Sequence, residues 1–283
     1  MAVIINGRKL ADSVLDSVAE DVIGINGDVS LAVVLVGDNN ASATYVRSKI
    51  RDCNRCGIKS FDYTLPENTS QDELLSLIEE LNNNDSVDGI LVQMPLPRQI
   101  DEDVISSAIS PCKDVDGFHP ENLGKLIRGV DGLRPCTPSG IMVMLYEYGI
   151  DLDGKSAVVI GRSSIVGKPM ELMLLERNAT VTIAHSHTDE KKLIELCRGA
   201  DVLIVACGVA KMVKAGWVKD GATVIDVGIN RDEDDRLCGD VDFDSVSNVA
   251  GAITPVPGGV GLMTRAMLMR NVVIAAKMRR GVC

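Results

Sequence analysis

The sequence predicts an α/β protein with two α/β domains, the second of them a Rossmann-like, doubly wound parallel sheet. Apolar, strand-like runs alternate with helical patterns along nearly all of the 283 residues, and such alternation favours parallel sheets. The length corresponds to about two domains of roughly 150 residues each. Residues 158–169 pass from an apolar strand through a glycine-containing loop into a helix, a layout that places backbone amides against a phosphate.

The first half alternates strands and helices up to Gln93. Ser70 and Glu73 form a capping box at the start of one helix. The last strand ends just before two prolines that turn the chain away. The predicted order is strand 31–36, helix 42–56, strand 59–63, helix 70–82 and strand 89–92.

A stretch dense in Gly, Pro and Asp, residues 111–138, is predicted to be rich in loops, with the domain boundary in it or near its end. The predicted domains are 1–134 plus 265–283, and 135–264. The elements expected after the loop are helix 139–148, strand 157–160, helix 167–177, strand 180–184, helix 189–198, strands 202–206 and 223–227, and helix 261–278.

Composition excludes several classes of function. The net charge is −11 and Lys and Arg form no block, so a general nucleic-acid binder is excluded. No apolar run approaches the roughly 20 residues of a membrane span, and the amino terminus has no signal-peptide layout. Eight cysteines spread over a long chain favour reduced thiols. We therefore expect a cytoplasmic protein without a membrane partner.

No metal site is predicted. Cys53 and Cys56 form a CxxC late in a helical pattern, without a second pair or a nearby histidine. His185 and His187 have no acidic or thiol partner in the sequence.

The loop after strand 157–160 has two phosphate-binding interpretations. A P-loop needs four residues between its first glycine and the Gly-Lys pair, followed by Ser or Thr. Here five residues separate Gly161 from Gly167, and Pro169 follows Lys168, which excludes that interpretation. A dinucleotide loop remains, with Ser163 in place of the second glycine. A strand–helix turn without a ligand also stays open.

The expected cofactor is NADP rather than NAD. An acid about 20 residues after the glycine loop usually accepts the ribose 2′-hydroxyl. This chain has His185, Ser186 and His187 there, with no carboxylate, and Arg162 lies in the loop. A cation with a hydroxyl suits a 2′-phosphate.

Four residues of the first half are candidates for chemistry. Tyr45 and Lys49 lie four apart on one helical face, and a lysine beside apolar surface can exchange protons near neutrality. Gln93 stands at the carboxyl end of a strand, and parallel sheets bind ligands beyond these strand ends. Asp116 belongs to an Asp-x-Asp-Gly loop. The alternatives are a surface lysine beside a half-buried tyrosine, a loop amide and an ordinary turn.

The ordered set of motifs resembles the bifunctional methylenetetrahydrofolate dehydrogenase/methenyltetrahydrofolate cyclohydrolase family. The motifs span nearly the whole chain. They are Tyr45-x-x-x-Lys49, the segment 87–97 around Gln93, Lys113 to Phe118, Pro135-Cys136-Thr137-Pro138, the loop 161–169, Asp226 to Asn230, and 255–261. Leu262 departs from the proline usual at this place in the family.

The resemblance implies a two-domain homodimer that binds folate in a cleft between the domains. It implies NADP-dependent oxidation of 5,10-methylenetetrahydrofolate and hydrolysis of the methenyl product to 10-formyltetrahydrofolate, within purine biosynthesis. The implied catalytic residues are Lys49, Gln93 and Asp116, the last of which binds the pterin. The implied folate-binding residues are Tyr45, Pro257, Gly258, Gly259 and Val260, and the cofactor-binding residues are Gly161, Arg162, Ser163, Ser186 and Ile229.

Two other functions stay open at this point. One is a dehydrogenase of another small substrate built on the same two-domain frame. The other is a cofactor-sensing module without catalysis.

Overall fold

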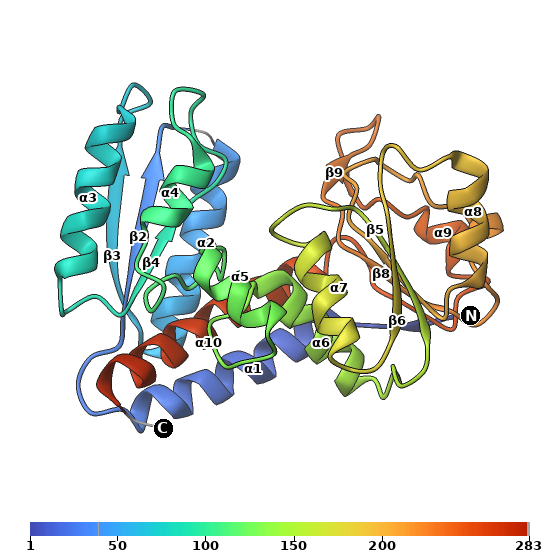
Figure 1. The fold of residues 1–283 in the computed structure, drawn as a ribbon, viewed down its shortest axis with the longest axis horizontal. Helices are drawn as coiled ribbons and strands as arrows, with labels where there is room; N and C mark the ends of the chain where they lie inside the picture. The colour runs from blue at the N-terminus through green and yellow to red at the C-terminus, as the bar shows by residue number, and fades with distance from the viewer. Residues whose placement is uncertain (39, 282–283) are drawn as a thin grey trace. The chain divides into compact units, whose positions relative to one another are not determined.

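A computed structural model describes residues 1–38 and 40–281, without the side chains of residues 40–43. The chain divides into two compact units (Figure 1). The six-stranded unit comprises Met1–Ala11 and Thr137–Thr264, and the three-stranded unit comprises Asp12–Cys136 and the chain from Arg265 onward. Each unit contains a parallel sheet, which confirms the predicted α/β class.

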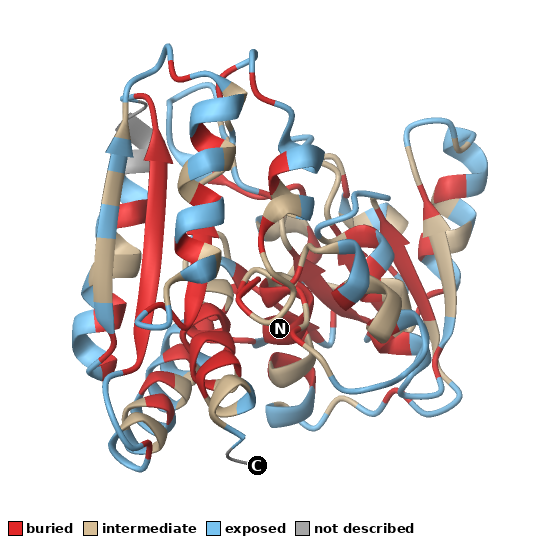
Figure 2. Cartoon of the chain, turned by 60° about the vertical axis from the view of Figure 1, so that its left-hand side comes forward, coloured by how far each residue is buried: buried red, intermediate tan, exposed pale blue. Residues whose placement is uncertain are grey.

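The three-stranded sheet has the order β3-β2-β4, with all strands parallel. Its strands are β2 (Ser30–Val36), β3 (Lys59–Leu65) and β4 (Gly89–Val92). The central strand β2 is buried along its whole length (Figure 2), because helices cover both faces of a parallel sheet. That double burial explains the continuous apolar run in the sequence.

The two faces of this sheet meet different helices. Ala32, Val34 and Val36 share one core with residues of α3 (Gln71–Asn83) and α4 (Glu102–Ala108). Alternate residues of a strand point to the opposite face. Helix α2 (Asn40–Cys56) contacts β2 and β3, and the Cys53 thiol on α2 lies 3.6 Å from Met269 Sδ on α10 (Val260–Arg280).

The predictions missed four of the described α-helices, namely the short α9 (Phe243–Val246), α1 (Gly7–Ile23), α4 and α5 (Pro120–Ile127). The last is a correction, since it lies in the segment 111–138, which was expected to be rich in loops and for which no helix was predicted. Proline fits the first turn of a helix, where no amide partner is lost. His119 caps this helix, because its Nδ1 accepts from the Glu121 amide at 3.0 Å.

The six-stranded sheet is parallel throughout and has the order β1-β11-β8-β7-β5-β6. Five of these strands have the doubly wound order 2-1-3-4-5 when they are numbered along the chain. Read across the sheet, they are β6, β5, β7, β8 and β11. In such sheets the ligand binds where the strand order reverses, here between β5 and β7. The strands are β1 (Val3–Ile4), β5 (Ser156–Ile160), β6 (Thr180–Ala184), β7 (Val202–Val205), β8 (Thr223–Asp226) and β11 (Ala252–Ile253).

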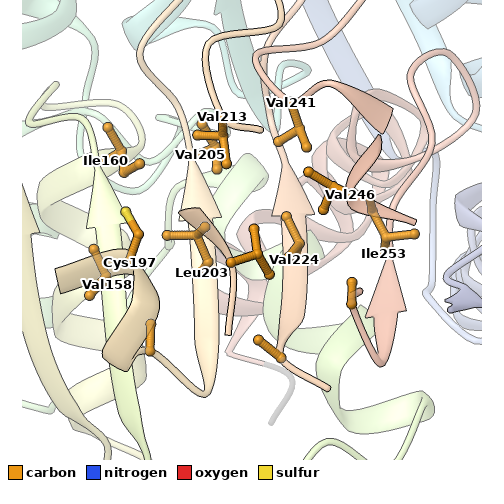
Figure 3. Close-up of a cluster of buried hydrophobic side chains, with 14 of the residues drawn as sticks. Val158, Ile160, Cys197, Leu203, Val205, Val213, Val224, Val241, Val246 and Ile253 are labelled. Atoms are coloured by element: carbon orange, nitrogen blue, oxygen red, sulfur yellow. The ribbon is translucent and has the colours of Figure 1, made fainter. Parts of the chain in front are cut away.

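The helices of this unit are α6 (Cys136–Glu147), α7 (Gly167–Leu175), α8 (Glu190–Gly199), α9 (Phe243–Val246) and a 3-10 turn (Ala215–Trp217), and a hairpin joins β9 (Asn230–Arg231) to β10 (Leu237–Cys238). Figure 3 shows one of its cores. Val158, Leu203 and Val224 from three adjacent strands meet Cys197 of α8 and Val246 of α9. Because these strands are neighbours in the sheet, their side chains on this face form one continuous apolar layer.

The expected domain division differs from the structure at the amino terminus. Residues 1–11 were assigned to the first domain, but they belong to the six-stranded unit. The reason is strand pairing, because Val3 and Ile4 extend the sheet in parallel with Ala252 and Ile253. A two-residue strand leaves no periodic signal in the sequence.

Within the described ranges no helix has the length and apolar character needed to span a bilayer.

Candidate active site

Lys49 and Gln93 come together in the three-stranded unit. Lys49 projects from α2, and its Nζ donates to Gln93 Oε1 at 3.0 Å. Gln93 directly follows β4, and its backbone amide donates to Val34 O at 2.8 Å, so it stands at the carboxyl end of the sheet. Its side-chain nitrogen donates to Met94 O, which directs Oε1 toward the lysine.

The surroundings of Lys49 differ from those of a surface lysine. Lys49 is half-buried and hydrogen-bonded. Tyr45, one helical turn earlier, is 41% exposed. A partly sheltered ammonium therefore lies on the same helical face as an accessible aromatic ring, which offers a flat surface to a planar ligand.

Asp116 reaches the same end of the sheet as Gln93. Ile90 of β4 pairs in parallel with Asp114, so the segment leading to Asp116 runs beside β4 in the same direction. Asp116 as a residue is half-buried, and burial of its carboxyl raises the pKa of that group to about 6. The Lys49 ammonium opposes this shift and the Asp114 carboxylate adds to it. Such a carboxyl exchanges protons near neutral pH.

Asp114 organises the loop that presents Asp116, a role that the sequence analysis missed. The side chain is buried. Its oxygens accept hydrogen bonds from the backbone amides of Gly117, Phe118 and His119 and from Asn122 Nδ2. These bonds fix the loop on one side of Asp116.

Asn271 of α10 holds the same loop from the other side and was also missed. It is 3% exposed, and its Nδ2 donates to Val115 O at 2.8 Å and to Arg134 O at 2.9 Å. Gly117 has φ +78, and a Cβ there would lie 2.4 Å from the Arg134 carbonyl carbon. An asparagine inside an otherwise apolar helical pattern was the available signal, since buried amides need partners.

The glycine-containing loop joins β5 to α7 in the six-stranded unit. Gly161 has φ +132, and a Cβ there would lie 2.2 Å from Ala206 O, so only glycine fits. Ser163 Oγ accepts from the amides of Val166 at 3.1 Å and Gly167 at 3.3 Å. The Ser163 hydroxyl proton remains available as a donor to an anion.

A cavity of about 760 Å³ opens where the strand order reverses. Gly161 and Arg162 line it after β5, and Cys207 lines it after β7. His185, Ser186 and Thr188 add the segment after β6, with Glu190, Lys211 and Lys214 among the other lining residues. Hydroxyls, cations and backbone groups in a cavity at this place fit the phosphorylated ribose of a dinucleotide. Ser163 and Ile229 do not line this cavity among the described residues.

Two buried carboxylates shape the loops beside this cavity. Asp240 accepts from the amides of Cys207 at 2.7 Å and Gly208 at 2.9 Å. Asp226, at the end of β8, accepts from the amides of Gly228 and Asp240, and burial raises its pKa to about 6. Ile229, a predicted cofactor residue, follows this network and is 54% exposed.

The Pro257 to Val260 segment lies in the six-stranded unit, between β11 and the start of α10. Gly258 O accepts from the Gly7 amide at 3.0 Å. A Cβ on Gly7 would lie 2.1 Å from Gly259 O. The backbone of this segment is therefore packed closely against the backbone of Gly7. Of its four residues, Pro257 is the exposed one.

No group of three or more His, Cys, Asp or Glu side chains suited to a metal occurs in the part of the chain that the structure describes. Burial raises the pKa of Cys53 to about 12 and of Cys56 to about 11. Thiols with such pKa values resist the deprotonation that metal ligation requires.

Fold and site together define an α/β enzyme whose chain combines a nucleotide-binding parallel sheet with a unit carrying a lysine, an amide and a carboxyl. The catalytic-domain model of the tetrahydrofolate dehydrogenase/cyclohydrolase family matches residues 5–116, and the model of its NAD(P)-binding domain matches residues 135–280. The bifunctional protein FolD of Agathobacter rectalis is 54% identical over 282 residues, which cover 98% of this chain and 100% of that protein.

Two solved structures agree with this match. The FolD dehydrogenase/cyclohydrolase of Campylobacter jejuni gives a TM-score of 0.95 at 50% identity, covering 99% of this chain and 100% of that chain. The Trypanosoma brucei enzyme, solved with NADP and an inhibitor, gives 0.94 at 37% identity, covering 99% and 98%.

The chain belongs to the tetrahydrofolate dehydrogenase/cyclohydrolase family. The predicted family, its fold, its two enzyme activities and its nicotinamide cofactor are thereby confirmed. The match leaves the other two functions, a dehydrogenase of another substrate and a sensor, without support.

Proposed function

We propose that the protein oxidises 5,10-methylenetetrahydrofolate with NADP and then hydrolyses the 5,10-methenyl product to 10-formyltetrahydrofolate. The observation that carries this proposal is the Lys49–Gln93 hydrogen bond at the carboxyl end of β4, with Asp116 at the same end. The three-stranded unit is then the folate-binding catalytic domain, and the six-stranded unit is the NADP-binding domain.

In the first step a hydride leaves a carbon that lies between two nitrogens. Their lone pairs stabilise the resulting cation, so the step mainly requires alignment. NADP supplies the hydride acceptor when bound. The Tyr45 ring stacks on the folate, and the Asp116 carboxylate accepts hydrogen bonds from the pterin. Pro257, Gly258, Gly259 and Val260 also contact the folate.

In the second step water adds to the methenyl carbon and loses a proton. The bond from this carbon to N5 then breaks, the new hydroxyl loses its proton to become the formyl oxygen, and N5 takes up a proton. Lys49 carries the proton, because its ammonium can give a proton to N5 as the bond breaks, and the resulting amine can then take the proton of the hydroxyl. Gln93 orients Lys49 through the 3.0 Å hydrogen bond.

The cofactor loop supports NADP. Arg162 and Ser186 line one cavity, and together they supply the charge and the hydroxyl that a 2′-phosphate requires. Gly161, Ser163 and Ile229 contact the remainder of the cofactor, with Gly161 allowing close approach.

One assay tests the proposal. Purified protein receives 5,10-methylenetetrahydrofolate with NADP or with NAD, and absorbance follows the reduced cofactor and the methenyl product together. We expect reduced cofactor to form, methenyl product to decay, and NADP to be preferred. Absence of turnover would favour the sensor, and a strong preference for NAD would remove the argument from Arg162 and Ser186.

The protein is further proposed to work as a cytoplasmic homodimer whose product donates formyl groups for purine synthesis. The supports are the family resemblance and the free thiols of the described cysteines. Light scattering on a size-exclusion column tests the dimer, and a monomeric mass at assay concentrations contradicts it.

A further inference from the structure

The nucleotide cavity is lined mainly by basic side chains, although the protein as a whole is acidic. The whole chain has a net charge of −11. Among the described residues, the cavity is lined by three basic side chains, those of Arg162, Lys211 and Lys214, and by one acidic side chain, that of Glu190. Local cations in an acidic protein attract an anionic ligand to one place only.

The lining residues identify which part of the cofactor this cavity serves. Of the phosphate loop 161–167, only Gly161 and Arg162 line it. His185 and Ser186 join them at the end of β6. In dinucleotide folds this strand end meets the ribose 2′ position. The cavity therefore serves the adenosine end of the cofactor rather than the nicotinamide.

Lys211 has a backbone conformation that its side chain does not favour. Its φ is +53, in the left-handed region that glycine and asparagine adopt most easily. The backbone is held there because its amide donates to Gly239 O at 3.0 Å. A lysine in strained backbone beside a ligand cavity points to a role for its charge.

The Lys211 ammonium is available to an incoming anion. It lies 3.4 Å from Asp232 Oδ2, and the lysine side chain is 49% exposed. A long and partly exposed ion pair of this kind is weak. A phosphate dianion in the cavity carries more charge than the Asp232 carboxylate and can therefore compete with it for the Lys211 ammonium.

We infer that Lys211 is a further specificity-determining residue, whose ammonium binds the 2′-phosphate of NADP together with Arg162 and Ser186. The inference rests on the proposed NADP-dependent function. Lys214, which also lines the cavity, adds a further basic side chain.

Calorimetric binding of two cofactor fragments, 2′,5′-ADP and 5′-AMP, to the full chain tests this inference without turnover. The variant is Lys211→Asn, because asparagine tolerates the left-handed backbone, and Lys211→Gly serves as a second variant. We expect the affinity for 2′,5′-ADP to fall about 5- to 10-fold in both variants. Affinity for 5′-AMP should change less than about twofold, since it lacks the 2′-phosphate.

Lys219→Asn is the matched control. Lys219 pairs with Asp201 at 2.6 Å and does not line the cavity, so its removal changes the net charge equally. Unchanged 2′,5′-ADP binding in both Lys211 variants would overturn the inference. Equal losses for both fragments, or an equal loss in Lys219→Asn, would also overturn it. If the unsubstituted protein itself does not prefer 2′,5′-ADP, the proposed NADP preference fails, and the role of Lys211 fails with it.

Discussion

Lys49 Nζ lies 3.0 Å from Gln93 Oε1, and this hydrogen bond joins helix α2 to the end of strand β4. The two residues are 44 positions apart in the chain. Because Gln93 also donates to Met94 O, its amide has one orientation and presents an acceptor to the lysine. The ammonium is therefore held by the sheet as well as by its own helix.

Replacing Lys49 with methionine should abolish the cyclohydrolase activity. Methionine keeps the length of the side chain but cannot carry a proton, and general acid–base catalysis contributes about 100-fold or more. The measurement is the decay of methenyltetrahydrofolate absorbance. Lys125→Met is the control, because Lys125 forms a surface pair with Glu121. Normal hydrolysis by Lys49→Met would refute the assignment.

The folded protein should lose stability as the Asp116 carboxyl ionises. Its pKa is about 6 in the folded protein against 3.8 for an ordinary aspartate. Below about pH 4 the carboxyl is protonated in both states, and this contribution is present in full. It is lost as the pH rises through 6, because the folded state must then hold a buried charge.

Asp116→Asn isolates this effect from Asp226, whose pKa is also raised to about 6. The difference in free energy of unfolding, variant minus wild type, should grow by about 2 kcal/mol between about pH 4 and pH 8. Urea denaturation measures it, with the exposed Asp28→Asn as control. The KM for folate should rise in the wild type as the pH falls below about 6, and this trend should vanish in Asp116→Asn. A pH-independent difference would contradict the assigned pKa.

Asn271→Leu should destabilise the three-stranded unit by about 2 kcal/mol, because Val115 O and Arg134 O each lose the hydrogen bond from the Asn271 amide. Since those carbonyls flank the loop of Asp116, the KM for folate should also rise. Asn54→Leu, at an exposed position of α2, should change stability by less than about 0.5 kcal/mol. Equal effects in the two variants would remove the special role of Asn271.

Gly161→Ala should weaken cofactor binding, because the new methyl group clashes with a neighbouring backbone atom in addition to straining the backbone of residue 161. The new methyl group would lie 2.2 Å from Ala206 O, whereas a Cβ at Gly154, which also has positive φ, meets no atom within 4 Å. We expect at least about 10-fold weaker NADP binding in Gly161→Ala. Gly154→Ala should cost only about 1 kcal/mol of stability. Titration of NADP separates the two, and similar affinities would contradict the steric argument.

Several elements were predictable because their signals are local. The strands β2, β5 and β7 are buried on both faces, so their sequences are continuous apolar runs. The capping box of Ser70 and Glu73 is present at the start of α3. Helix α5 was hidden because its start contains a proline and a histidine cap, which also occur in loops.

The functional residues also divide into those with a local sequence signal and those without one. Tyr45 and Lys49 were recognisable as a pair because four residues bring side chains to one helical face. Asp114 and Asn271 were missed because most of their partners are backbone atoms, whose positions no residue pattern records. Lys211 was missed for a similar reason, since neither its positive φ nor its place on the cavity wall leaves a mark in the sequence.

The sequence by itself determined the α/β class, the motifs and the family resemblance, because periodicity, turn residues and spacing are properties of neighbouring residues. Only the tertiary structure decided that Val3 and Ile4 join the six-stranded sheet, that Gln93 meets Lys49, and that cations gather around one cavity in an acidic chain. These relationships depend on strand order and on packing between distant segments, and a side chain acquires such neighbours only when the chain folds.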